Sequence, residues 1–287
     1  MPPTITEAHP PIPLSELLAL IEAFPVISLV EKRAALSRLV SAHVTISLEW
    51  GKGWTYRRTR KLDPDIRPER VDELIWRKDV PAHLGRANPA GFQVLYVSDR
   101  LNTSLREARV ASGPVVVAEF AIRDDRSTRV APIGEFAQIQ RTGRGYLSGD
   151  VCDAVTGMMN ACSPDDGLSL VITDAFLQEC FINDDSYELS SHIALAIFDK
   201  CPAVSAIVYP SRRQPGGLNF AVKVETFWRD WALIGARYGT ARHLACGYYR
   251  LADVQAADGV FQDGRMRWCD VEEGERIVLE PYVPMGE

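Results

Sequence analysis

Short apolar runs that are rich in β-branched residues recur through the middle of the chain, and turn-forming residues bound them. This pattern predicts β-strands. The predicted strands are residues 54–58, 93–98, 114–122, 169–173, 204–211 and 218–224. Nearer the end, an Asp-Gly pair inside residues 260–268 predicts a β-hairpin.

Apolar positions three and four residues apart predict helices. The first such helix spans residues 14–24, and its apolar face consists of Leu14, Leu17, Leu18 and Ile21. A second spans residues 30–44, so the two predict an N-terminal α-hairpin. Before them, the Pro-rich residues 1–13 are expected to form an extended tail. Further helices are predicted over residues 101–111, 151–159 and 187–200.

Strands and helices follow one another without strict alternation, which predicts the α+β fold class. A chain of 287 residues suits one large domain, or a medium-sized domain with additions. A core of that size needs neither a metal ion nor a disulfide for folding.

Composition narrows the classes of function. The net charge of −6 argues against non-specific binding to nucleic acid, although a local basic cluster can still hold a small anion. The six cysteines form no C-x-x-C pair and no zinc-finger spacing, so we expect free thiols, several of them buried, and no metal site. No apolar run approaches the ~20 residues that cross a bilayer. The first residues lack the features of a secretory signal, so we expect a soluble, cytoplasmic protein.

The first stretch with possible chemistry is Gly-Arg-Ala-Asn-Pro-Ala-Gly at residues 85–91. Asn88 precedes a proline and is therefore biased to an extended conformation, while the flanking glycines can adopt positive φ. The loop presents Arg86, whose planar guanidinium suits an anion. An ordinary exposed turn arginine fits the same local pattern.

Two further side chains follow this loop. Tyr96, on the strand at residues 93–98, is either a core aromatic or the wall of a pocket. Glu107, on the helix that begins after the N-cap candidate Asp99, has no basic residue three or four positions away. It is either a solvated surface carboxylate or part of a site.

The fourth stretch, residues 208–219, ends a buried strand at Tyr-Pro-Ser and turns through two glycines into the next strand. Ser211 stands in no G-x-S-x-G elbow, and no histidine is an evident base partner. A hydrogen-bonding role therefore suits Ser211 better than a nucleophilic one. Arg212 and Arg213 add positive charge, as does the basic run at residues 56–61.

Taken in order, these pieces resemble the RES domain family, which is named for Arg, Glu and Ser residues in its signature. The shared features are an early aromatic-Arg pair, a G-R-x-N-P-x-G loop, a strand ending in Leu-Tyr, a helix with Thr-x-x-x-Glu, a Tyr-Pro-Ser segment and a later Asn. They stand here at Tyr56-Arg57, residues 85–91, Leu95-Tyr96, Thr103 to Glu107, residues 209–211 and Asn219. The resemblance covers residues 54–224.

This resemblance implies a fold similar to that of ADP-ribosyltransferases, with mixed sheets flanked by helices. We accordingly expect a tail and helical extension at residues 1–50, the RES domain at residues 51–240 and a β-rich extension packed on it at residues 241–287. Family toxins are usually shorter than this chain. Whether Arg57 or the adjacent Arg58 faces the site stays open in the sequence.

The family includes bacterial toxins that degrade NAD⁺, so the resemblance implies cleavage of the nicotinamide–ribose bond. Carried over residue by residue, it assigns Arg57 and Arg86 to the pyrophosphate and ribose region. It assigns Tyr96 to the nicotinamide side and Asn219 to binding. The residues it assigns to catalysis are Glu107, Arg86 and Ser211, and Ser211 also makes polar contacts in the pocket. NAD⁺ is then the substrate, and no cofactor or metal is expected.

Two other activities use the same residues: transfer of ADP-ribose to a macromolecule, and a catalytically silent binding or regulatory role. The expected partners beyond NAD⁺ are a separately encoded antitoxin-like protein and a second copy of the chain. Neither nucleic acid nor a membrane is expected as a direct partner.

Overall fold

The computed structural model describes residues 3–64, 66–76, 80–147, 149–271 and 274–280. Helices and strands both contribute extensively, and parallel and antiparallel strand pairs occur, which confirms the α+β fold class. The chain divides into two compact units. The first unit contains residues 1–50, 82–92 and 129–209, and the second contains residues 51–81, 93–128 and 210–287.

The first unit is mainly helical. Its helices are α1 (Ile5–Ala8), α2 (Leu14–Ala23), α3 (Leu29–Ala42), α5 (Glu135–Thr142), α6 (Cys152–Asn160), α7 (Pro164–Asn183) and α8 (Ser190–Lys200), with a 3-10 turn at Gly149–Val151. Its strands β1 (Leu48–Trp50), β5 (Thr128–Pro132) and β6 (Ala206–Pro210) lie in that order 1-5-6, and β5 pairs with β6 in parallel.

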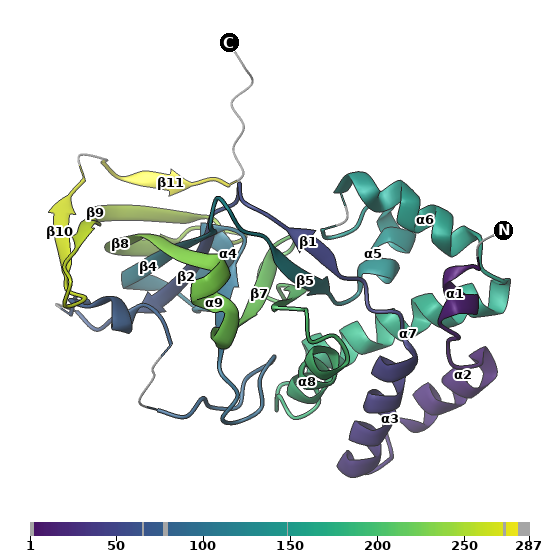
Figure 1. The fold of residues 1–287 in the computed structure, drawn as a ribbon. Coiled ribbons are helices and arrows are strands. Elements are labelled where there is room, and N and C mark those ends of the chain that lie inside the picture. Colours follow the sequence, from purple (N-terminus) through teal and green to yellow (C-terminus); the bar gives the residue numbers. More distant parts are fainter. Residues whose placement is uncertain (1–2, 65, 77–79, 148, 272–273, 281–287) are drawn as a thin grey trace. The chain divides into compact units, whose positions relative to one another are not determined.

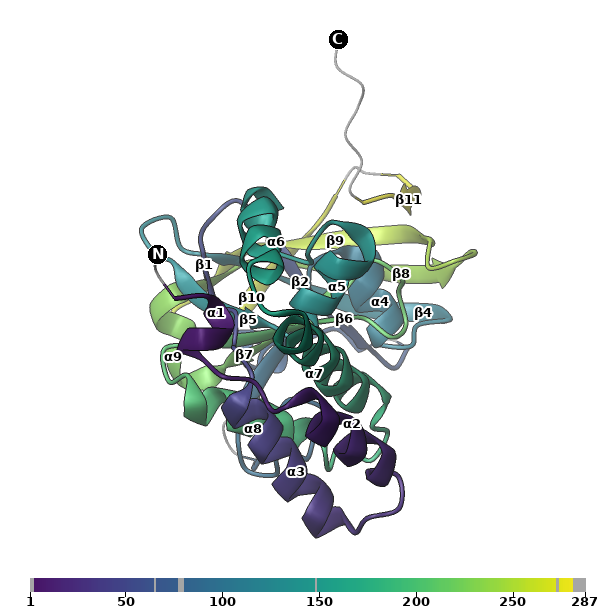
Figure 2. The ribbon, with the colours of Figure 1, turned by 90° about the vertical axis from the view of Figure 1, so that its right-hand side faces the viewer.

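The predicted N-terminal hairpin is present as α2 and α3, both of which pack on α7 (Figure 2). The inward face predicted for α2 is wrong at Leu18. Leu17 is fully buried, but Leu18 is 43% exposed, because the inward stripe continues through Phe24 instead. The expected extended tail is also partly helical, since Thr4 and Glu7 form a capping box that starts α1.

The strand predicted at residues 169–173 is wrong, because these residues lie inside the twenty-residue helix α7. Ser163 caps the helix by accepting a hydrogen bond from the Asp166 N–H, and Pro164 occupies its first turn. Leu170 and Leu177 then bury one face of α7. These start signals and the helical spacing outweigh the strand preference of Val171 and Ile172.

The second unit is built on an antiparallel sheet (Figure 1). Its strands are β2 (Tyr56–Lys61), β3 (Val94–Ser98), β4 (Ser112–Ile122), β7 (Leu218–Lys223), β8 (Trp231–His243), β9 (Tyr249–Val260), β10 (Met266–Asp270) and β11 (Arg276–Val278). They lie in the order 7-3-2-4-8-9-10, with β11 also paired to β9. Helices α4 (Leu101–Glu107) and α9 (Val224–Asp230) and the 3-10 turn Val71–Glu73 complete the unit.

The two faces of this sheet differ. On one face, Leu101 and Leu105 of α4 pack against an apolar cluster from β4, β8, β9 and β11. On the other face, Tyr56 contacts the rings of Phe220 and Trp231 edge to face. Burial on both faces fixes the strand register, because a slip of one residue would exchange the two sets of side chains.

The predicted hairpin at residues 260–268 is confirmed. Strands β9 and β10 pair in antiparallel, and the Phe261 N–H donates to the Arg265 carbonyl across the turn. The helix predicted over residues 101–111 ends earlier, at Glu107. Arg109 has φ of 53°, so the backbone leaves the helix there and Val110 turns into the core.

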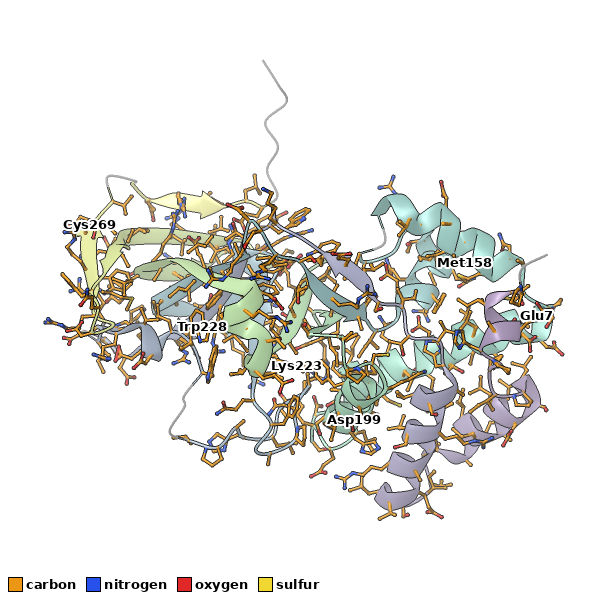
Figure 3. All side chains as sticks on the ribbon, in the orientation of Figure 1. Glu7, Met158, Asp199, Lys223, Trp228 and Cys269 are labelled. Carbon is orange, nitrogen blue, oxygen red and sulfur yellow. The ribbon has the colours of Figure 1, made fainter. Side chains whose placement is uncertain are left out.

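All six cysteines are free. Cys152 is buried, whereas Cys246 and Cys269 are exposed, the latter on β10 (Figure 3). Burial raises the pKa of the Cys180 thiol to about 12, so this thiol stays protonated at neutral pH. Within the described ranges, no helix is both long and apolar enough to cross a membrane.

Candidate active site

A row of polar side chains crosses one face of the second unit's sheet. Arg57 on β2 pairs directly with Glu119 on β4 and with Ser98 on β3. Ser98 in turn pairs with Asn219 on β7. Residues that pair directly in an antiparallel sheet point to the same face. The same row therefore collects side chains from four strands on the face that α4 covers.

Glu107, the last residue of α4, is fixed by this row. Its Oε1 accepts hydrogen bonds from Ser211 Oγ at 2.6 Å and from Asn219 Nδ2 at 2.8 Å. The Asn219 amide is itself oriented, because Ser98 Oγ donates to its Oδ1 at 2.8 Å. Ser211, Asn219 and Ser98 are all buried. The Ser98–Asn219 hydrogen bond is therefore shielded from water, whereas the two hydrogen bonds to Glu107 are part-buried.

The second carboxylate oxygen of Glu107 is in a different situation. Arg213 Nε lies 3.7 Å from Oε2, and the Glu107 side chain is 32% exposed. From the residues that the structure describes, Oε2 accepts no hydrogen bond. The carboxylate is therefore held firmly at one oxygen and can meet a ligand with the other.

The loop after β6 supplies Ser211 in a fixed orientation. Its Oγ accepts hydrogen bonds from the N–H groups of Arg213 and Gln214 while donating to Glu107. Backbone conformation and steric limits explain why this loop contains two glycines. Gly216 has φ of 74°, and a Cβ on Gly217 would lie 2.5 Å from Thr103 Oγ1.

Arg57, and not Arg58, lies on the sheet face that carries Asn219, because residue 57 is in direct register with Ser98. Arg57 Nη1 donates to the Thr55 carbonyl at 2.8 Å. Arg58 points to the opposite face, where burial, aided by the charge of Arg60, lowers its pKa to about 9. Tyr96, two residues before Ser98 on β3, shares the face of Arg57 and is partly exposed.

Arg86 lies in the first unit, at the C-terminal end of α7. Its Nη1 donates to the carbonyl oxygens of Phe181 and Ile182, and its guanidinium lies 5.2 Å from the ring centroid of Tyr187. The loop is closed by reciprocal backbone hydrogen bonds between Gly85 and Asn88. Arg86 therefore satisfies helix-end carbonyls, a contact that the sequence did not predict.

The structure thus brings Glu107, Ser211 and Asn219 into one hydrogen-bonded cluster, with Arg57 and Tyr96 on the same sheet face. That Arg86 serves the same site stays a prediction.

A family model for the RES domain matches residues 67–232, more than half of the chain. The chain belongs to the RES domain family. The match includes the five candidates from Arg86 to Asn219, while Arg57 precedes it. No curated protein matches the chain significantly.

Sequence reasoning missed Ser98, which orients Asn219, and Glu280, whose carboxylate contacts Arg57. Ser98 could have been found, because it ends the strand that carries Tyr96, and residues two apart share a face. Nothing in the local sequence marks Glu280. Its contacts join residues 179 or more positions apart.

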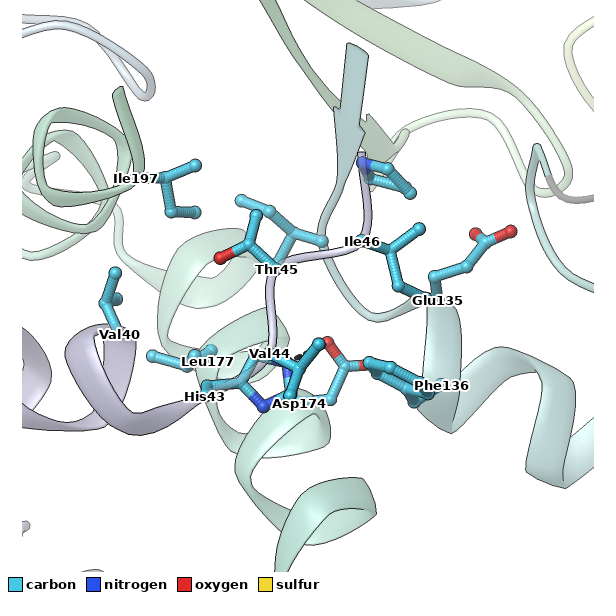
Figure 4. Close-up of a pocket in the computed structure, with 12 residues that line it drawn as sticks. Val40, His43, Val44, Thr45, Ile46, Glu135, Phe136, Asp174, Leu177 and Ile197 are labelled. Carbon is cyan, nitrogen blue, oxygen red and sulfur yellow. Dashed lines mark ion pairs between the residues drawn. The ribbon is translucent and has the colours of Figure 1, made fainter. Parts of the chain in front are cut away.

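Figure 4 shows a small cavity in the first unit, and none of the candidate site residues lines it. His43 Nε2 lies 3.4 Å from Asp174 Oδ1 there, and apolar side chains make up most of the wall. Asp174 also accepts hydrogen bonds from the N–H groups of Gly134 and Ala137 at the start of α5. The cavity holds about 20 Å³, enough for one water molecule.

Proposed function

We propose that this RES domain protein consumes NAD⁺ by cleaving the bond between nicotinamide and ribose, through hydrolysis or phosphorolysis. The observation that carries the proposal is the Glu107 carboxylate. Ser211 and Asn219 hold it by one oxygen, while its side chain stays 32% exposed and its second oxygen lies 3.7 Å from Arg213 Nε. Family membership supports the same activity.

The chemistry fits such a carboxylate. When the N-glycosidic bond of NAD⁺ breaks, positive charge develops on the ribose in an oxocarbenium-like state. A fixed carboxylate beside the ribose stabilises this charge and can orient the acceptor. Nicotinamide leaves as a neutral molecule, so the reaction needs no strong general acid.

The remaining roles follow from charge and position. Arg57 would bind the diphosphate, and Tyr96, on the same face, would pack against the nicotinamide side. Arg86 would complete the binding of the diphosphate and ribose. Ser211 and Asn219 would act chiefly by positioning Glu107. NAD⁺ is the substrate, and the proposal requires no further cofactor.

The test is product analysis after purified protein is incubated with NAD⁺, with and without phosphate. Free ADP-ribose indicates hydrolysis, and phosphorylated ADP-ribose that forms only with phosphate indicates phosphorolysis. Glu107→Gln keeps the shape of the side chain but removes its charge, so we expect turnover to fall by ~100-fold or more. Glu225→Gln, an exposed carboxylate with a side chain 71% accessible, is the matched control.

Unchanged NAD⁺ at high enzyme concentration would contradict the proposal. Equal behaviour of wild type and Glu107→Gln would favour the silent binding module instead. Label from NAD⁺ that stays on a macromolecule would favour ADP-ribosyl transfer. If the protein has a toxin-like role, we expect a separately encoded protein partner, which co-purification would detect. We also expect self-association, which light scattering would measure.

A further inference from the structure

The carboxylate of Glu280 forms an ion pair with the guanidinium of Arg57. Glu280 follows β11, and its Oε1 lies 3.1 Å from Arg57 Nη2. Its Oε2 accepts a hydrogen bond of 2.7 Å from the Leu101 N–H. Both oxygens are therefore engaged, and the two charged side chains are only 18% and 28% exposed.

This is the closest carboxylate contact that Arg57 makes among the described residues. Glu119 Oε1, from the neighbouring strand, stands 3.9 Å from Arg57 Nε, and that nitrogen has no hydrogen-bond partner. Glu119 also lies 3.7 Å from Arg237, so its charge is shared between two arginines. Glu280 thus supplies the main anion at the Nη2 edge of Arg57.

A carboxylate and a phosphate group present the same features to an arginine: negative charge and two oxygen acceptors side by side. If Arg57 binds the diphosphate of NAD⁺, as proposed above, Oε1 of Glu280 stands where a phosphate oxygen would bind. We propose that Glu280 is an internal competitor for this subsite, so that its carboxylate restrains NAD⁺ binding. This inference rests on the proposed function.

Strand β11, which Glu280 follows, is attached to the sheet in a way that allows release. Strand β11 pairs with β9 through only Arg276, Ile277 and Val278. Val278 is buried, whereas Ile277 and Leu279 on either side of it are 58% and 48% exposed. A short edge strand with one buried anchor opens at lower cost than the sheet beneath it.

Glu280 restrains NAD⁺ binding by lowering the fraction of molecules that are able to bind it. The apparent affinity for NAD⁺ equals the intrinsic affinity multiplied by the fraction of molecules in which Arg57 is free of Glu280. Removing the Glu280 charge raises that fraction. It leaves Glu107, Ser211 and Asn219 unchanged, so binding should improve while turnover stays the same.

The experiment compares wild type, Glu280→Gln and Glu275→Gln. Glu275 is the matched control, because it precedes the same strand and pairs with Arg250 at 3.1 Å. For Glu280→Gln we expect the KM for NAD⁺ to fall ~3–10-fold with kcat unchanged, the gain from freeing one charge-paired arginine. Glu275→Gln should match wild type. A misfolded variant would not produce this gain.

A KM for Glu280→Gln equal to or above that of wild type would overturn the inference. A calorimetric titration with inorganic pyrophosphate separates this outcome from failure of the proposed function. If no variant consumes NAD⁺, tighter pyrophosphate binding by Glu280→Gln than by wild type still supports competition at Arg57. Equal pyrophosphate affinities would reject it.

Discussion

Asn219 uses the two ends of its amide for opposite purposes. Its Oδ1 accepts from Ser98, and its Nδ2 donates to Glu107. Only one orientation of the amide satisfies both contacts, because a flipped amide would turn its oxygen toward the carboxylate. Ser98 therefore determines how Glu107 is held, although it does not touch Glu107.

We expect Ser98→Ala to loosen Glu107 through Asn219. Turnover of NAD⁺ should fall by ~3–30-fold with little change in KM, since loss of one buried hydrogen bond costs ~1–2 kcal/mol. Ser98→Thr, which restores the hydroxyl, should recover most of the turnover. A parallel loss in KM, or no recovery by threonine, would show that Ser98 matters only for packing.

The candidate residues were recognisable in the sequence because the family pattern preserves their order, but their roles depended on distant contacts. Glu107 had no helical partner in the sequence, and its partners lie 104 and 112 residues later. The choice between Arg57 and Arg58 needed the pairing of β2 with β3, which no local pattern supplies. Register fixes such choices, and turns and tertiary packing fix register.

At the scale of elements, the N-terminal hairpin and the apolar strands of the second unit were predictable, because one-sided burial leaves its period in the sequence. Helix α7 was not recognised. Its middle reads Ser-Leu-Val-Ile-Thr, and short apolar runs fit strand and helix alike. The decision comes from capping at Ser163 and from burial over twenty residues, which a five-residue window does not reveal.

The C-terminal end of α7 gives Arg86 a structural role beside the one proposed in the site. Because Arg86 donates to the carbonyl oxygens of Phe181 and Ile182, we expect Arg86→Ala to lower the free energy of unfolding by ~1–3 kcal/mol. Urea unfolding of wild type and variant measures this change. Arg33→Ala, at an ion pair on α3 whose arginine side chain is 41% exposed, is the control and should cost less.

Unchanged stability in Arg86→Ala would mean that the helix-end contacts contribute little. Any loss of NAD⁺ turnover in that variant could then be assigned to substrate binding. If Arg86→Ala is less stable than wild type, the activities of the two proteins have to be compared at temperatures where both are folded.

At the scale of the whole molecule, hydrogen bonds hold several carboxyl pKa values below their ordinary range. At Asp184, burial acts to raise the pKa, but hydrogen bonds from Ser186, Ser190 and Leu189 outweigh it and lower the pKa. The other lowered carboxyl groups are Glu16, Glu31, Asp258 and Asp263, whereas burial raises the pKa of Asp99.

A group with a lowered folded-state pKa stabilises the protein above its unfolded pKa, about 4, and this contribution is lost as the pH falls toward the folded value. We therefore expect the free energy of unfolding to decrease from pH 5 to pH 3. Asp184→Asn should be less stable than wild type at pH 7 and should show a smaller decrease. Equal pH dependence of the two proteins would contradict the role given to Asp184.

Each compact unit is assembled from three separate stretches of chain. During synthesis, a nascent chain of 200 residues already contains Glu107 but neither Ser211 nor Asn219, the side chains that fix its carboxylate. Strand β8, which pairs with both β4 and β9 in the finished sheet, comes later still. A nascent chain that has not yet reached Asn219 therefore lacks an ordered Glu107, and whatever chemistry this carboxylate performs begins only after Ser211 and Asn219 have been added.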